Sequence, residues 1–133
     1  MSDSRTVVAT IGRDKFNTQL SNAVHSLVAD EPVDAGGQDA GPTPGDYMRM
    51  SLASCTAITL RMYANRKQLD VEKIVVTVTS GQQQYKTVFT CVIAVTGNIT
   101  EEQRARLEEI AHRCPVHKVL TNPIEIETKL VLA

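Results

Sequence analysis

Three features of the sequence predict an α+β fold. Short β-branched or alternating runs, which favour strands, occur near both ends of the chain and in its middle. The range 46–67 contains neither glycine nor proline and repeats apolar residues at helical spacing. The predicted order is βββ-α-ββ-α-α-β, which lacks the βαβα alternation of a doubly wound sheet. We therefore expect antiparallel sheets that flank a long central helix.

The first three strands are expected to form an antiparallel meander. The ranges 6–11, 16–20 and 25–29 are short and apolar, β-branched or alternating, and turn residues separate them. The range 30–44 holds three glycines, three prolines and four acids, a composition typical of an exposed loop. It is long for a connection, which favours a functional loop.

The long helix is predicted over 46–67, where it would span roughly 30 Å. Apolar residues repeat along one face, namely Met48, Leu52, Cys55, Thr59 and Met62. The opposite side is nearly as apolar, with Met50, Ala53, Ala57 and Ile58. A helix that is apolar on most of its circumference is normally buried, and a chain this small cannot cover every side of it. We therefore expect a second copy of the chain to cover part of it, in a homodimer.

The second half predicts a hairpin, two helices and a last strand. Alternating apolar residues over 74–79 and 85–95 predict two strands, with Ser80-Gly81 as the turn. Thr100, followed by two acids and Gln103, predicts a capping box that opens a helix to about residue 113. Pro115 suits the first position of a short helix to about residue 120. The alternation over 124–132 predicts the last strand.

Composition excludes several classes of protein. The chain of 133 residues fits a single domain, 1–133. Fourteen basic and fifteen acidic side chains give a net charge of -1, so we expect no nucleic-acid partner. No apolar run approaches the roughly 20 residues of a membrane span, so we expect no membrane partner and a cytoplasmic location. An odd count of three cysteines, without a signal peptide, argues against a permanent disulfide framework.

Cys114 is the thiol that local sequence marks most clearly. It is the expected N-cap of the helix that begins at Pro115, where free N–H groups and the helix dipole lower a thiol pKa. Arg113 and His117 would add positive potential. The alternative interpretation is a small residue at a helix junction.

The other two cysteines have plainer local interpretations. Cys55 shares a helix face with Leu52 and Met62, so by itself it indicates a packed core cysteine. Cys91 alternates with apolar residues on a strand and is predicted to be structural. Cys114 and His117 could face one ion, but no third ligand has suitable spacing, so we expect no metal and no cofactor. Motifs for phosphate binding and serine hydrolysis are missing from the sequence.

Taken together, the motifs resemble those of the OsmC/Ohr family of osmotically induced and organic-hydroperoxide-resistance proteins. The matching segments are Asp30-Glu31-Pro32, Gly36-Gly37, Gly41-Pro42-Thr43-Pro44, Ser51-Leu52-Ala53-Ser54-Cys55-Thr56-Ala57, Leu60-Arg61-Met62-Tyr63-Ala64 and Cys114-Pro115-Val116-His117-Lys118. The similarity covers essentially the whole chain and is closest to the OsmC-like redox-protein branch.

The resemblance implies an intertwined α+β homodimer with two long central helices and active sites at the subunit interface. It also implies a cysteine-based peroxidase for oxidative-stress defence. Cys55 would attack an organic hydroperoxide and become a sulfenic acid, and Cys114 would resolve it as a disulfide. A cellular dithiol would then reduce that disulfide.

The resemblance further assigns an activating arginine and its carboxylate partner. Arg13 matches the arginine of the family's N-terminal strand region. The peroxidase branches carry a glutamate just after the proline before the central helix, whereas here Gly45 follows Pro44 and the nearest acid is Asp46. The expected catalytic residues are thus Cys55, Cys114, Arg13 and Asp46. The alternative function is a non-catalytic protein that binds a small molecule or senses redox state, with an apolar pocket beside the thiols.

Overall fold

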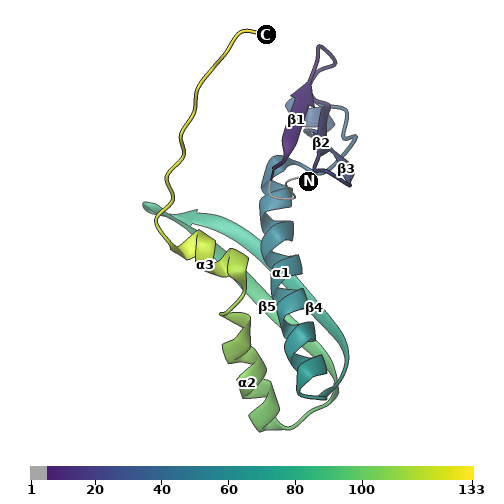
Figure 1. Ribbon diagram of the computed structural model, residues 1–133, viewed down its shortest axis with the longest axis vertical. Coiled ribbons are helices and arrows are strands. Elements are labelled where there is room, and N and C mark those ends of the chain that lie inside the picture. The colour runs from purple at the N-terminus through teal and green to yellow at the C-terminus, as the bar shows by residue number, and fades with distance from the viewer. Residues whose placement is uncertain (1–5) are drawn as a thin grey trace. The chain divides into compact units, whose positions relative to one another are not determined.

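The computed structural model describes residues 6–133, which divide into a unit ending at Met48 and a unit beginning at Arg49. The elements are β1 (Val8–Ile11), β2 (Thr18–Ser21), β3 (Ser26–Ala29), the 3-10 helix η1 (Val33–Ala35), α1 (Pro44–Arg66), β4 (Asp70–Gln83), β5 (Lys86–Asn98), α2 (Glu101–Ala111) and α3 (Pro115–Thr121) (Figure 1). The α+β class and the order βββ-α-ββ-α-α are confirmed.

The first unit contains the predicted meander. Strand β2 pairs antiparallel with both β1 and β3, so the sheet order is β1-β2-β3. The second strand begins at Thr18 rather than at residue 16, because the preceding turn continues to Asn17. Lys15 takes the left-handed conformation there, and the Asn17 N–H donates to the carbonyl of Asp14 at 3.2 Å.

The loop between β3 and α1 is organised around a buried carboxylate at its first residue, so the prediction of an exposed loop fails at Asp30 and Gly37 but not at its other residues. Asp30 is only 1% exposed and accepts backbone N–H groups from Glu31, Gln38 and Ala40. Burial acts to raise the pKa of Asp30, but these three hydrogen bonds lower it more. Gly37 packs so closely that an added Cβ would lie 2.0 Å from the Glu31 carbonyl oxygen. The loop therefore has one defined conformation.

Helix α1 begins two residues earlier than predicted, with Pro44 in its first turn. Thr43 and Asp46 cap this end reciprocally. The Thr43 N–H donates to the Asp46 carboxylate and the Asp46 N–H donates to the Thr43 hydroxyl, each at 3.1 Å. The Tyr47 hydroxyl donates to the Val28 carbonyl at 2.7 Å, which ties the helix start to β3.

The second unit contains a long antiparallel hairpin of β4 and β5. The predicted turn at Ser80-Gly81 is wrong: Gly81 lies within the ladder opposite Val88, and the hairpin turns at Gln84-Tyr85. Gln84 supplies the positive φ of 55° that the turn needs, although a glycine would favour this conformation more. The sheet therefore extends beyond the range that alternation predicted.

The core of the second unit lies between α1, α2 and the hairpin. It contains Leu60, Ala64, Val71, Leu107, Ile110 and Ala111. Helix α1 contributes a buried stripe at four-residue spacing, namely Leu52, Thr56, Leu60 and Ala64. Of the predicted face, Leu52 is fully buried in a single copy of the chain, Cys55 and Thr59 are half-buried, and Met48 and Met62 are exposed. Because the helix is apolar on most sides, its sequence does not single out the face that α2 and the hairpin cover.

Other large side chains of α1 remain exposed. The exposed fraction is 53% for Met48, 49% for Met50, 53% for Ile58 and 65% for Met62. None of the helices in residues 6–133 has the length and hydropathy that crossing a membrane requires. Met50, Ile58 and Met62 thus leave large apolar side chains of α1 exposed in a single copy of the chain.

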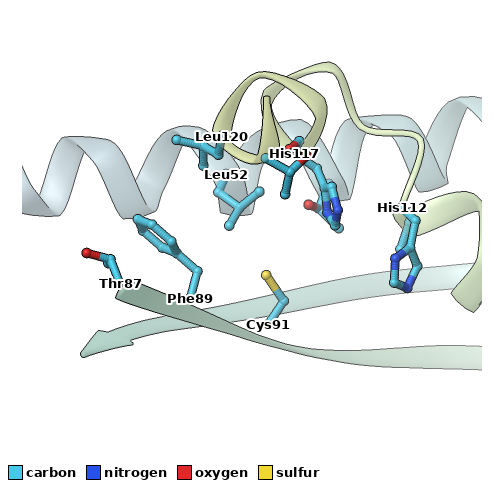
Figure 2. A pocket seen from close by; sticks show the side chains of 10 residues that line it. Leu52, Thr87, Phe89, Cys91, His112, His117 and Leu120 are labelled. Atoms are coloured by element: carbon cyan, nitrogen blue, oxygen red, sulfur yellow. Dashed lines mark hydrogen bonds between the residues drawn. The ribbon is translucent and has the colours of Figure 1, made fainter. Parts of the chain in front are cut away.

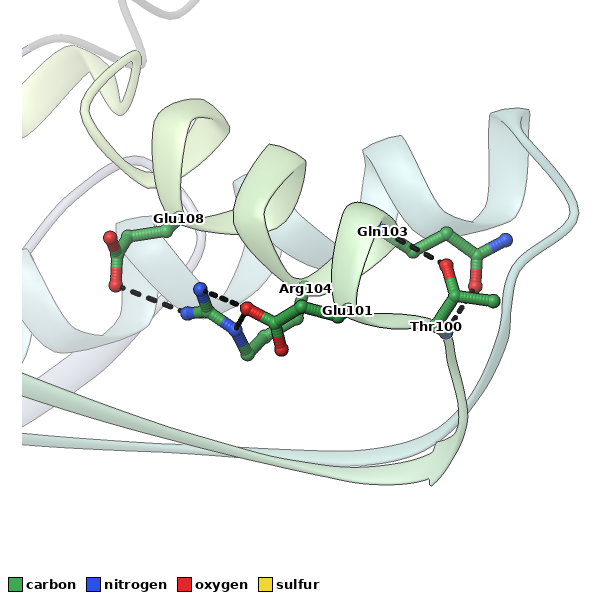
Figure 3. A network of polar contacts seen from close by, with 5 residues as sticks. All are labelled: Thr100, Glu101, Gln103, Arg104 and Glu108. Carbon is green, nitrogen blue, oxygen red and sulfur yellow. Dashed lines mark hydrogen bonds and ion pairs between the residues drawn. The ribbon is translucent and has the colours of Figure 1, made fainter.

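The predicted capping box of α2 is confirmed (Figure 3). The Gln103 N–H donates to the Thr100 hydroxyl at 3.1 Å, and the Thr100 N–H donates to the Gln103 side-chain oxygen at 2.9 Å. Arg104 forms ion pairs with Glu101 and Glu108 along the same helix. These exposed pairs add little to stability, whereas the cap satisfies backbone groups that the helix leaves free.

The predicted last strand over 124–132 is not formed. Residues 123–133 contain neither helix nor strand, and Figure 1 shows them extending away from α3. The exposed fraction is 82% for Ile126, 85% for Leu130 and 94% for Leu132. A strand needs a neighbouring strand, and none pairs with this segment within residues 6–133. The segment has the apolar alternation of a strand, but a single copy of the chain offers it no strand to pair with.

Candidate functional site

Three free thiols lie in the second unit, each on a different element. Cys55 is half-buried on α1, Cys91 is exposed on β5, and Cys114 is fully buried directly before α3. The structure thus brings the two sequence-predicted cysteines into one unit. Cys91, which the sequence predicted to be structural, is not part of a packed core.

Cys114 is the N-cap of α3, as predicted. Its sulfur accepts the backbone N–H of His117 at 3.5 Å. Burial acts to raise the pKa of Cys114, but hydrogen bonds from the Cys55 thiol, the His117 backbone and the Thr56 side chain outweigh it and lower the pKa. Cys114 therefore ionises more easily than an ordinary cysteine.

Cys55 has the opposite shift. Burial raises the pKa of Cys55, and its hydrogen bond to Cys114 raises it further, while the Val116 backbone N–H acts in the other direction. The two thiols therefore act on each other: Cys114 raises the pKa of Cys55, and Cys55 lowers the pKa of Cys114. With a single negative charge on the pair, the structure places that charge on Cys114.

Arg13 and Asp46 lie in the first unit, whereas both thiols lie in the second. Arg13 is exposed in the turn between β1 and β2, where its carbonyl accepts the Lys15 N–H at 3.1 Å. Asp46 is half-buried at the start of α1, and its carboxylate accepts the Thr43 N–H. Their expected roles beside Cys55 stay predictions.

A cavity of about 560 Å³ lies between α1, β5, the end of α2, and α3. It is lined by Leu52, Thr56, Thr87, Phe89, Cys91, Ala111, His112, His117, Leu120 and Thr121. Figure 2 shows the Cys91 sulfur pointing from β5 toward Leu52. The rings of His112 and His117 lie with their centroids 5.3 Å apart.

Sequence reasoning missed Cys91 as a cavity residue. Strand alternation placed it on one face with Phe89, and both residues do line the cavity. The signal was therefore present, but alternation cannot distinguish a strand face that packs in a core from one that borders a cavity. Across residues 6–133, no three histidine, cysteine or acidic side chains are grouped to hold a metal ion.

Known proteins resemble the chain over most of its length. A family model described as OsmC-like protein matches residues 36–129. No curated protein matches the sequence significantly. One solved structure is a putative osmotic stress induced and detoxification response protein from Psychrobacter arcticus 273-4. It has a TM-score of 0.73 at 21% identity, over 90% of this chain and 90% of that one.

Two further solved structures have the same fold. An OsmC-like protein from Mycoplasma pneumoniae has a TM-score of 0.75 at 17% identity, over 90% of this chain and 89% of that one. The organic hydroperoxide resistance protein OhrB of Bacillus subtilis has a TM-score of 0.62 at 21% identity, over 87% of this chain and 89% of that one.

Proposed function

The chain belongs to the family of OsmC-like proteins, and from this premise we propose that it is a cysteine-based peroxidase that reduces organic hydroperoxides. The observation that carries the proposal is the mutual influence of the Cys55 and Cys114 thiols, each of which shifts the pKa of the other. Two thiols near enough to act on each other in this way can pass between dithiol and disulfide without a large rearrangement. In this proposal Cys55 is the attacking thiol and Cys114 is the resolving thiol.

The opposite pKa shifts suit this division of roles. Cys114 has the lowered pKa of the pair, so its thiolate can take the Cys55 proton as the Cys55 sulfur attacks the terminal peroxide oxygen. The O–O bond breaks, the substrate leaves as an alcohol after gaining a proton, and Cys55 becomes a sulfenic acid. The Cys114 thiol then attacks the Cys55 sulfur, which forms the disulfide and releases water. A dithiol of unidentified source reduces the disulfide and returns both thiols.

The proposal is tested by titrating the reduced protein with cumene hydroperoxide. We expect two of the three thiols per chain to disappear with one equivalent of peroxide. Mass mapping of the unreduced peptides should then show Cys55 joined to Cys114. Three thiols that persist in excess hydroperoxide would sink the proposal. A protein first treated with a dithiol and desalted serves as the fully reduced reference.

Arg13 is proposed as the cation that stabilises the Cys55 thiolate, with Asp46 as its carboxylate partner. Within the second unit, burial and the Cys114 hydrogen bond both raise the Cys55 pKa, so activation at neutral pH needs a cation from elsewhere. Arg13→Ala should shift the pH of half-maximal oxidation upward by about one unit or more.

Stopped-flow oxidation rates across pH measure this shift. The variant's rate should still rise at about pH 9, because the thiolate fraction of a thiol with a raised pKa grows there. Arg13→Lys keeps the charge and should give an intermediate profile. Identical pH profiles for the protein and for Arg13→Ala would exclude Arg13 from this role.

We propose a homodimer as the working form, in the cytoplasm, where thiol reductants keep cysteines reduced. The exposed side chains of Met50, Ile58 and Met62 on α1 support it, because a second chain could cover these large apolar groups. The unpaired alternating segment 123–133 supports it as well, since a second chain can supply a strand neighbour. Sedimentation velocity at micromolar concentration should show twice the chain mass, and a monomer would refute it.

The cavity favours a second candidate function. A volume of about 560 Å³ with Leu52, Phe89 and Leu120 in its lining suits a small apolar ligand beside the thiols. In this alternative the protein binds a small molecule or senses redox state without turnover. Native mass spectrometry that finds a co-purified ligand, together with no peroxide turnover when a dithiol is supplied, would favour it.

A further inference from the structure

The burial of Cys114 limits how the proposed disulfide can be reduced. A reducing thiolate must reach a sulfur of the disulfide in line with the S–S bond. Cys114 is 0% exposed and Cys55 is only half-exposed, so direct attack on the Cys114 sulfur from solvent is blocked. Cys91 is exposed and borders an open cavity in the same unit.

Cys91 and Cys114 share two neighbours. Thr56 and His117 line the cavity together with Cys91. The same two residues contact Cys114, since the His117 N–H donates to its sulfur and the Thr56 side chain hydrogen-bonds to it. Figure 2 shows the Cys91 side chain rising from β5 into the cavity, across from His117. Of the three thiols, Cys91 is the exposed one, and it shares these two neighbours with the buried Cys114 sulfur.

We propose that Cys91 is a third redox-active cysteine, which relays electrons from a dithiol in the cavity to the disulfide between Cys55 and Cys114. The Cys91 thiolate attacks the Cys114 sulfur, so the Cys91–Cys114 bond forms and the Cys55–Cys114 bond breaks. Cys55 leaves as a thiolate, ready for the next hydroperoxide. The dithiol then attacks the exposed Cys91 sulfur, and its own oxidation to a disulfide restores the Cys91 and Cys114 thiols.

The charges of the site favour this order of events. Partial desolvation raises the pKa of the Cys91 thiol, and the nearby negative charge of Cys114 raises it further. In the reduced protein Cys91 is therefore less ionised than an ordinary cysteine. Once Cys114 enters a disulfide it carries no charge, so this repulsion disappears. Cys91 then ionises more easily, at the stage when there is a disulfide to attack.

The exchange requires Cys91 and Cys114 to approach to the S–S bond length of about 2 Å. Cys114 lies at the junction of α2 and α3, and α3 is only seven residues long. Thr56 and His117 line the cavity with Cys91 and contact Cys114, so the approach requires these two residues to move aside. No group other than the dithiol is consumed in the cycle, so atoms and electrons balance.

The inference rests on the proposed peroxidase function and is tested separately from it. The protein and Cys91→Ser are each oxidised with one equivalent of cumene hydroperoxide, and dithiothreitol then reduces them. We expect Cys91→Ser to form the Cys55–Cys114 disulfide at the normal rate but to lose it about tenfold more slowly. Cys91→Ala should behave alike. Thr90→Ser, an exposed substitution at the neighbouring position of β5, should be reduced at the rate of the unaltered protein.

A trapping experiment tests the intermediate directly. Cys55→Ser is oxidised with diamide, and its unreduced peptides are mapped by mass spectrometry. A Cys91–Cys114 disulfide supports the relay, and its absence overturns it. Reduction of oxidised Cys91→Ser at the unaltered rate also overturns the relay, while the peroxidase proposal stands. Failure to form any Cys55–Cys114 disulfide would overturn both.

Discussion

Replacing Cys55 with serine is expected to abolish hydroperoxide turnover, with a loss on the order of a thousandfold or more. A serine hydroxyl fills nearly the same space but is neither appreciably ionised near neutral pH nor able to form a sulfenic acid or a disulfide. Because Cys55 is only half-buried, the substitution should leave the fold intact. The measurement is steady-state consumption of cumene hydroperoxide with dithiothreitol as reductant.

Cys114→Ser is the matched comparison, because it should separate attack from resolution. This variant should consume about one equivalent of hydroperoxide per chain and then hold Cys55 as a sulfenic acid, which dimedone labels. Cys55→Ser should give no such burst. The reverse pattern, with a burst only in Cys55→Ser, would exchange the two roles. That outcome would agree with the pKa shifts in the reduced protein, since the pKa of Cys114 is the one that is lowered.

Local signals near helix ends were read correctly from the sequence, because few residues determine them. Thr100 and Gln103 form the capping box that their spacing predicted, and Cys114 caps the helix that Pro115 opens. Each involves hydrogen bonds between residues three positions apart. The proximity of Cys55 to Cys114, in contrast, came from the family resemblance, since 59 intervening steps of chain (114 − 55) carry no distance information.

The errors occur where structure depends on what packs against an element. The buried stripe of α1 includes Thr56 but not Met62. The positions of α2 and the hairpin decide which face of the helix is buried. Gly81 suggested a turn by its flexibility, yet cross-strand pairing with Val88 keeps it in the ladder. The strand predicted near the C-terminus has the correct alternation and lacks a neighbour. Exposure of Cys91 is a similar case, because a cavity exists only after several elements have packed.

Leu60→Ala is expected to destabilise the protein by about 3–4 kcal/mol. Leu60 is 0% exposed at the centre of the core that joins α1 to α2 and the hairpin. Two of its core neighbours, Ala64 and Ala111, have no side-chain rotamers that could move into the space. The substitution therefore leaves a cavity, and the full loss of transfer and packing energy should be observed.

Urea unfolding at one fixed chain concentration measures this loss, since association in a dimer makes apparent stability depend on concentration. Leu60→Met conserves most of the volume and should cost less than about 1.5 kcal/mol. An unchanged unfolding midpoint in Leu60→Ala would contradict the position of Leu60 in the core. Because Cys55 lies five residues earlier on the same helix, a loosened α1 should also slow its oxidation. Leu60→Met should restore stability and oxidation rate together, which would attribute the slower oxidation to the lost packing.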